Sequence, residues 1–127
     1  MKTELLYKIA DIINSNSTKY RAVIPRVRRQ YMTQQGNSLV KSTCLVLNIM
    51  VTTRPKNHVS RSIWNIYEKD IDKIIKKIGR RDKEFAQRID NCEPTLFDIE
   101  VIVRRASFQA LKLNLVKTSY DIYLENS

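Results

Sequence analysis

Glycine and proline are scarce in this chain, which holds two glycines and three prolines among 127 residues. β-Sandwiches and barrels join many short strands through turns that these residues favour. The scarcity therefore favours long helices. The length fits a single domain, residues 1–127, and is sufficient for a core that needs neither disulfides nor metal. A hydrophobic content of 43% separates the chain from disordered tails.

Helical periodicity is visible in two segments near the N-terminus. Residues 3–14, "TELLYKIADIIN", place Leu and Ile at three- and four-residue spacing. Residues 18–35 carry a second stripe, formed by Tyr20, Val23, Ile24, Val27 and Tyr31. Pro25 either kinks this second helix or lies in its first turn, and Gly36 ends it.

The segment 38–52, "SLVKSTCLVLNIMVT", is apolar nearly all round and permits two interpretations. Alternating apolar residues at positions 45, 47, 49 and 51 suit a strand, whereas a buried central helix capped by Ser38 suits the overall composition. Because the neighbouring segments have helical patterns, we expect a helix here.

The C-terminal half has three further helical patterns. Residues 57–78 carry a continuous isoleucine-rich stripe, and residues 81–91 suggest a short helix. Thr95, with Asp98 three residues later, predicts the start of a helix over 96–116. The sequence therefore predicts an all-α protein, a single compact bundle of about five helices.

Charge is distributed unevenly along the chain, whose formal net charge is +10. No Asp or Glu occurs between Asp11 and Glu68, and nine basic residues lie in that window. Residues 68–127 carry twelve basic and eleven acidic side chains, a net charge of +1. Such asymmetry is typical of proteins that bind nucleic acid or an anionic surface.

Residues suited to catalysis or to metal binding are few. His58 is the only histidine, and two distant cysteines with one histidine do not supply the four clustered ligands of a metal site. The chain has no glycine-rich phosphate loop. We therefore expect a protein that is not an enzyme and has no cofactor and no metal. A small nuclease built on His58 is a third-ranked hypothesis, because one histidine at a helix start is more often a capping or exposed residue.

The cysteines and the apolar segments indicate where the protein works. Cys44 lies in an apolar run and is predicted to be a buried thiol. No secretory signal is recognisable at the N-terminus. "LVKSTCLVLNIMV" is too short and too interrupted to span a bilayer. We expect a reduced cytoplasmic protein with no membrane partner.

Arginine dominates the acid-free window, with Arg26, Arg28 and Arg29 in close succession. Guanidinium groups bind phosphate oxygens in pairs, which favours a nucleic-acid backbone as the partner. Tyr20, Tyr31 and Trp64 either stack on bases or belong to the core, and their places on apolar stripes favour the core. The run "KKIGRR", residues 76–81, is a secondary contact. The candidate nucleic-acid-binding residues are Lys19, Arg21, Arg26, Arg28, Arg29, Lys41, Arg54, Lys56, Arg61, Lys76, Lys77, Arg80 and Arg81.

Residues 20–42, "YRAVIPRVRRQYMTQQGNSLVKS", resemble in layout the small helical subunit of CRISPR effector complexes. In that family a basic, tyrosine-containing helix breaks at a glycine and continues into an apolar helix. The resemblance covers about a fifth of the chain and makes Arg26, Arg28, Arg29 and Lys41 the matching basic positions. It implies an all-helical subunit with a role in antiviral defence that contacts nucleic-acid backbone without cutting it.

Two hypotheses of different kinds follow. The first is a non-catalytic subunit of a larger nucleoprotein complex that contacts the phosphate backbone of RNA or single-stranded DNA, with the other protein subunits as further partners. The alternative is a phage- or plasmid-type interaction protein whose basic face docks an acidic protein.

Overall fold

Five antiparallel strands occupy the middle of the chain, where the sequence pattern predicted helices. The computed structural model describes residues 2–52 and 63–116, and within them the fold is α+β, with four helices and five strands. The elements in chain order are α1 (Thr3–Asn16), β1 (Tyr20–Val23), β2 (Arg29–Gln35), β3 (Ser38–Cys44), β4 (Val46–Val51), β5 (Ile63–Tyr67), α2 (Glu68–Gly79), α3 (Lys83–Asp90) and α4 (Leu96–Ala106). The predicted all-α fold and helical bundle are therefore wrong.

The strands form two sheets. β4 lies between β1 and β5 in a three-stranded antiparallel sheet, and β2 pairs only with β3 in a separate hairpin. The register places Ala22 opposite Ile49, and Ile49 opposite Trp64. Because side chains alternate along a strand, these three residues lie on one face of the sheet.

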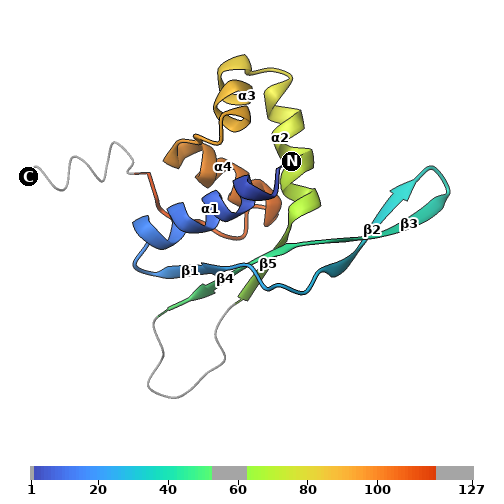
Figure 1. Ribbon diagram of the computed structural model, residues 1–127, viewed down its shortest axis with the longest axis horizontal. Helices are drawn as coiled ribbons and strands as arrows, with labels where there is room; N and C mark the ends of the chain where they lie inside the picture. Colours follow the sequence, from blue (N-terminus) through green and yellow to red (C-terminus); the bar gives the residue numbers. More distant parts are fainter. Residues whose placement is uncertain (1, 53–62, 117–127) are drawn as a thin grey trace, which may run out of the picture.

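Helices cover that face of the three-stranded sheet (Figure 1). Leu6 of α1, Leu47 of β4 and Ile99 of α4 are fully buried in one hydrophobic cluster. The ring of Tyr20 joins this cluster and lies nearly perpendicular to the ring of Trp64, with centroids 6.0 Å apart. The two rings are therefore packed in or against the core, as their places on apolar stripes predicted.

The outer edge of β1 is closed by a side chain of α1. Asn14 donates from Nδ2 to the carbonyl of Ala22 at 2.9 Å and accepts from the amide of Ala22 at 2.7 Å. An unpaired strand edge is a template for unwanted pairing, and the Asn14 amide satisfies it locally.

Strands replace the predicted helices in two segments. Residues 18–35 contain β1 and β2, and residues 38–52 contain β3 and β4. The alternation through positions 45–51 that suited a strand is the correct signal for β4, because its two neighbours bury it within a sheet.

The predicted helix over 57–78 holds only in its second part. Residues 63–67 form β5, and α2 begins at Glu68, while residues 57–62 lie outside the described part. The stripe of isoleucines therefore crosses a strand-to-helix junction, where Ile66 and Ile71 are both buried.

Both C-terminal helices lie where the sequence predicts helices: α3 begins at Lys83, two residues after the predicted start, and α4 begins at Leu96 as predicted. α3 buries Phe85 and Ile89. In α4, the Thr95 side chain accepts from the Asp98 amide, and the Asp98 carboxylate accepts from the Thr95 amide, which completes a capping box. This helix ends at Ala106, ten residues before the predicted end at 116.

The described segment after α4 has no regular secondary structure and is held by a buried acid. Glu100 is 9% exposed and accepts hydrogen bonds from the amides of Leu113 and Leu115 at 2.9 and 3.1 Å. Leu111 and Leu113 thereby complete the core without helical structure. None of the helices in the described residues combines the length and apolarity that a bilayer span requires.

Candidate nucleic-acid interface

A β-hairpin extends away from the helices and the three-stranded sheet (Figure 1). We call β2, β3 and the turn between them the hairpin arm. Gln35 pairs with Ser38, so the turn consists of two residues, Gly36 and Asn37. Gly36 has φ +59°, a conformation that glycine adopts without steric cost. A glycine at the first position of a two-residue turn suits the type II′ hairpin, whose twist matches the flanking strands.

One face of the arm is open to solvent along its whole length. Residues that pair across the two strands share a face, and this face consists of Gln30, Met32, Gln34, Leu39, Lys41 and Thr43. All six side chains are exposed. Its composition is amide, apolar and basic, and the arm contains no acidic residue.

A basic junction lies where the arm leaves the sheet. Val23 pairs with Asn48 and Arg29 pairs with Cys44, so the five residues 24–28 lie opposite the three residues 45–47. Two extra residues make this connection bulge, and Pro25, which has no amide hydrogen, fits such an unpaired position.

We define the basic junction as Arg26, Arg28 and Arg29. All three side chains are exposed. Among the residues that the structure describes, none of the three makes a side-chain hydrogen bond or ion pair. Three uncompensated guanidinium groups within four positions repel one another, and a bound polyanion would relieve that repulsion.

The base of the arm is fixed to α2 by a polar network. The Tyr31 hydroxyl donates to Asp70 and accepts from Lys73 Nζ at 2.9 Å. Lys69 Nζ donates to the Ser42 hydroxyl at 2.7 Å. The rings of Tyr31 and Tyr67 pack with centroids 5.7 Å apart. These contacts orient the arm relative to the body, so the basic junction is presented in a fixed place.

Burial and the hydrogen bond to Asp70 raise the pKa of the Tyr31 hydroxyl above its ordinary value. The hydrogen bond to Tyr31 raises the pKa of Lys73. Both groups therefore keep their protons at neutral pH, and the network needs no change of protonation to hold. Tyr31, 8% exposed, is thus an anchor of the arm, and its ring is not free to stack on a base.

The remaining predicted residues of the acid-free window lie on three different parts of the chain. Lys41 is on the open face of the arm. Arg21 is exposed on the face of the sheet opposite the helices, and Lys19 lies 5.4 Å from the Tyr20 ring centroid. Arg54, Lys56, Arg61 and the histidine, His58, lie outside the described residues. The described structure therefore brings Arg26, Arg28, Arg29 and Lys41 onto the arm and its base. Arg21 lies on β1, and Lys19 lies immediately before that strand.

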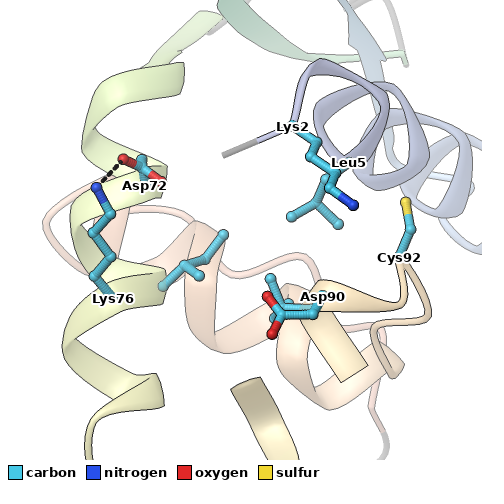
Figure 2. A pocket seen from close by; sticks show the side chains of 8 residues that line it. Lys2, Leu5, Asp72, Lys76, Asp90 and Cys92 are labelled. Atoms are coloured by element: carbon cyan, nitrogen blue, oxygen red, sulfur yellow. Dashed lines mark ion pairs between the residues drawn. The ribbon is translucent and has the colours of Figure 1, made fainter. Parts of the chain in front are cut away.

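The predicted secondary contact "KKIGRR" is divided between two sides of α2. Lys76 forms an i,i+4 ion pair with Asp72 at 3.0 Å, and both line a pocket that also contains Asp90 and Cys92 (Figure 2). Arg80 lines a neighbouring pocket together with Lys76 and Asp90. Acids therefore accompany this side of the helix.

Lys77 and Arg81 lie on the other side of α2, in a pocket with Arg105. The run thus contains one pair of cations beside acids and another pair without them, a distinction that the linear sequence did not indicate.

The described residues contain no group of three or more histidine, cysteine or acidic side chains that could hold a metal ion. Cys44 is fully buried, as predicted, and both Cys44 and Cys92 are free thiols.

The amides of the arm were missed at the sequence level. Gln30, Gln34 and Asn37 supply hydrogen-bonding groups on a projecting ribbon, whereas the sequence pattern predicts Gln30 and Gln34 in a helix and Asn37 just after its end. The signal that could have found them is the pair Gly36–Asn37 between two seven-residue segments, a spacing typical of hairpins.

The fold and the site together define an α+β protein with a projecting basic β ribbon. Comparisons with known protein families, with curated proteins and with solved structures found no match for this chain. The resemblance to a CRISPR small subunit stays a prediction, and the helices that it implied for residues 20–42 are replaced by β1, β2 and β3.

Proposed function

We propose that this protein binds the phosphate backbone of nucleic acid through the hairpin arm and the basic junction. The observation that supports the proposal most strongly is the junction itself: Arg26, Arg28 and Arg29 are exposed, have no side-chain partner among the described residues, and lie at the foot of an acid-free ribbon. Arginine is well suited to phosphate because its planar fork donates two parallel hydrogen bonds.

The shape of the arm favours duplex DNA as the substrate. The major groove of B-DNA admits a two-stranded β ribbon, whereas the major groove of A-form RNA is too narrow for side chains to read. The part of the arm beyond Tyr31 has four residues in each strand, which is roughly 13 Å of ribbon at about 3.3 Å per residue. That length exceeds the groove depth of about 8.5 Å, so the turn can reach the groove floor while the junction contacts the backbone.

The role in this proposal is binding, with sequence-independent contacts from the junction and groove contacts from the amides of the arm. Membership of a larger nucleoprotein complex and a cytoplasmic location stay predictions from the sequence.

The test is the affinity for a fluorescent DNA duplex of about 20 base pairs, measured by anisotropy as a function of salt. The variant R26E/R28E/R29E should lose binding and retain the far-UV circular dichroism of the parent. If each arginine contacts one phosphate, neutral Ala substitutions should lower the slope of log affinity against log salt by about 2.7, at about 0.9 per phosphate.

A charge-matched control separates local binding from general attraction. Lys8, Lys83 and Lys112 are exposed and lie away from the arm in the fold. K8E/K83E/K112E changes the net charge by the same amount and should reduce affinity far less. Equal losses in the two triple variants would contradict a site at the junction.

Exposed apolar side chains on the arm favour a second candidate, a protein partner. Leu39 is 64% exposed and Met32 48% exposed, and they are diagonal neighbours on the open face. Untagged protein purified at low salt discriminates between the candidates. Co-purifying nucleic acid supports nucleic-acid binding. A stoichiometric acidic protein that co-purifies with the parent but not with M32S/L39S supports a protein partner.

A further inference from the structure

A second basic pocket lies between the ends of α2 and α4, away from the elements of the arm. It has a volume of about 620 Å³ and is lined by Ile74, Lys77, Arg81, Arg105, Phe108 and Gln109. That volume falls within the range of about 300–1,000 Å³ that is usual for small-molecule sites.

The charge of this pocket is uncompensated. Its described lining contains three cations and no acid, whereas on the other side of α2 Lys76 and Arg80 share pockets with Asp90 of α3, and Lys76 with Asp72 of α2. An adjoining pocket of about 230 Å³ shares Arg105 and Gln109 and adds Arg104. The Arg104 Nε is buried and, within the described residues, has no hydrogen-bond acceptor. A buried donor without an acceptor is costly, and an anionic oxygen would satisfy it.

The aromatic residue at this pocket is held in a strained conformation. α4 ends in a Schellman arrangement, in which the Phe108 amide donates to the Arg105 carbonyl and the Gln109 amide donates to the Arg104 carbonyl. Phe108 therefore occupies the position that usually holds glycine, with φ +54°. A bulky residue with positive φ is a true outlier, and such strain persists mainly where function requires the side chain.

Packing does not account for this phenylalanine. Phe108 is 90% exposed, the most exposed of the large apolar side chains in the described residues. A strained, exposed aromatic ring beside a cluster of cations has the composition of a site that stacks a base and holds its phosphate.

We propose that this pocket binds a nucleotide unit of single-stranded nucleic acid, with the phosphate held by Lys77, Arg81 and Arg105 and the base stacked on Phe108. This inference rests on the proposed function in one respect, which is that the nucleotide belongs to a nucleic-acid strand. The arm would then contact duplex DNA, and the pocket an unpaired strand.

The test uses F108G, because glycine relieves the backbone strain while it removes the ring. The probe is a fluorescent twelve-nucleotide oligothymidylate, and its affinity should fall about tenfold. The melting temperature should stay unchanged or rise, and the affinity for duplex DNA should stay unchanged. If F108G loses affinity and also has a lower melting temperature, the titration is repeated with F108A and F108W. If the aromatic ring is what binds the base, only the tryptophan variant should restore binding.

The basic side of the pocket has a matched control on the same helix. K77A/R81A should weaken oligothymidylate binding and lower the salt slope by up to about 1.4, at about 0.7 per phosphate for single strands. K76A/R80A removes the same charges from the side whose pockets contain Asp72 and Asp90, and should leave the slope nearly unchanged. Equal effects of the two double variants would overturn the phosphate assignment.

Other outcomes separate this inference from the proposed function. Unchanged oligothymidylate affinity in both F108G and K77A/R81A overturns the pocket, whatever the arm does. Unchanged duplex affinity in R26E/R28E/R29E overturns the arm, whatever the pocket does. Binding of AMP as tight as that of the oligonucleotide, with adenosine inactive, would overturn the strand as the source and identify a free nucleotide.

Discussion

The helical body and the hairpin arm differ in what their side chains do. In the body, Leu6, Ile9 and Ile99 are fully buried in one cluster. In the arm, only Tyr31 and Cys44 are buried; both lie at or near its base and outside that cluster. The body is therefore specified by its packing, whereas most of the arm contributes little to stability. An exposed segment that contributes little to the core is a strong candidate for contact with another molecule.

The largest expected effect is a loss of stability on truncating the core. Leu6→Ala leaves a cavity in the cluster and should lower the free energy of unfolding by about 3 kcal/mol, within a range of about 2–5. The same truncation in the arm, Leu39→Ala, should change it by less than about 0.5 kcal/mol. Urea denaturation of both variants measures the contrast, and similar losses would show that the arm is part of the cooperative core.

A smaller effect is expected at Asp98, which joins two helices in the body. Asp98 is 3% exposed and accepts hydrogen bonds from Arg88 Nε and Nη2 at 2.8 and 3.0 Å. Burial alone would raise the pKa of this carboxyl, but Arg88 and the Thr95 amide lower it below its ordinary value. Asp98→Asn should therefore cost about 2 kcal/mol at pH 7 through the lost charged hydrogen bonds.

The pH dependence of that loss has a definite sign. Because the folded pKa lies below the unfolded value of about 3.9, the stabilisation by Asp98 is present above that pH. It disappears as the pH falls through the folded pKa. Denaturation curves of the wild type and Asp98→Asn should therefore converge below about pH 4, and a difference that persists there would contradict the ionic origin.

The smallest of the three effects is local to the arm. Tyr31→Phe removes the hydroxyl between Asp70 and Lys73 and should cost about 1 kcal/mol. Hydrogen exchange should accelerate at the amides of β2 and β3, while the amides of α4 keep their protection. Tyr7→Phe, on the exposed side of α1, is the matched control and should change neither. Uniform loss of protection across the molecule would show that Tyr31 stabilises the body as well.

The parts of the fold that were predicted correctly have sequence patterns that fit only one type of secondary structure. Thr95 and Asp98 form the predicted capping box, and Phe85 and Ile89, four residues apart, are the buried residues of α3 in the segment predicted to be a short helix. The stripe of apolar and aromatic residues at positions 20, 23, 24, 27 and 31 fits a helix but occurs here in strands and the connection between them. Tyr20 and Tyr31 belong to different sheets, and Val27 is exposed in the connection between them.

The arm was hidden because both of its faces meet solvent over most of its length. Without burial on one side, the strands lack the alternation of apolar and polar residues by which a strand is recognised. The charge signal was stronger than the fold signal. Arg26, Arg28 and Arg29 were selected by composition alone, and they remain together although the helix predicted to carry them is absent. The pocket at Phe108 is lined by residues from the ends of α2 and α4, which are far apart in the sequence, so no local pattern reveals it.

β3, the second strand of the arm, continues almost directly into β4, the middle strand of the three-stranded sheet. Only Leu45, 6% exposed, separates Cys44 from Val46. Tension applied at Gly36 and Asn37 would therefore pass along the covalent chain into β4. This strand is hydrogen-bonded to β1 on one side and to β5 on the other. Because those hydrogen bonds lie perpendicular to the strands, a pull along β4 loads them in shear and together. A load applied to the arm would therefore reach the central strand of the three-stranded sheet.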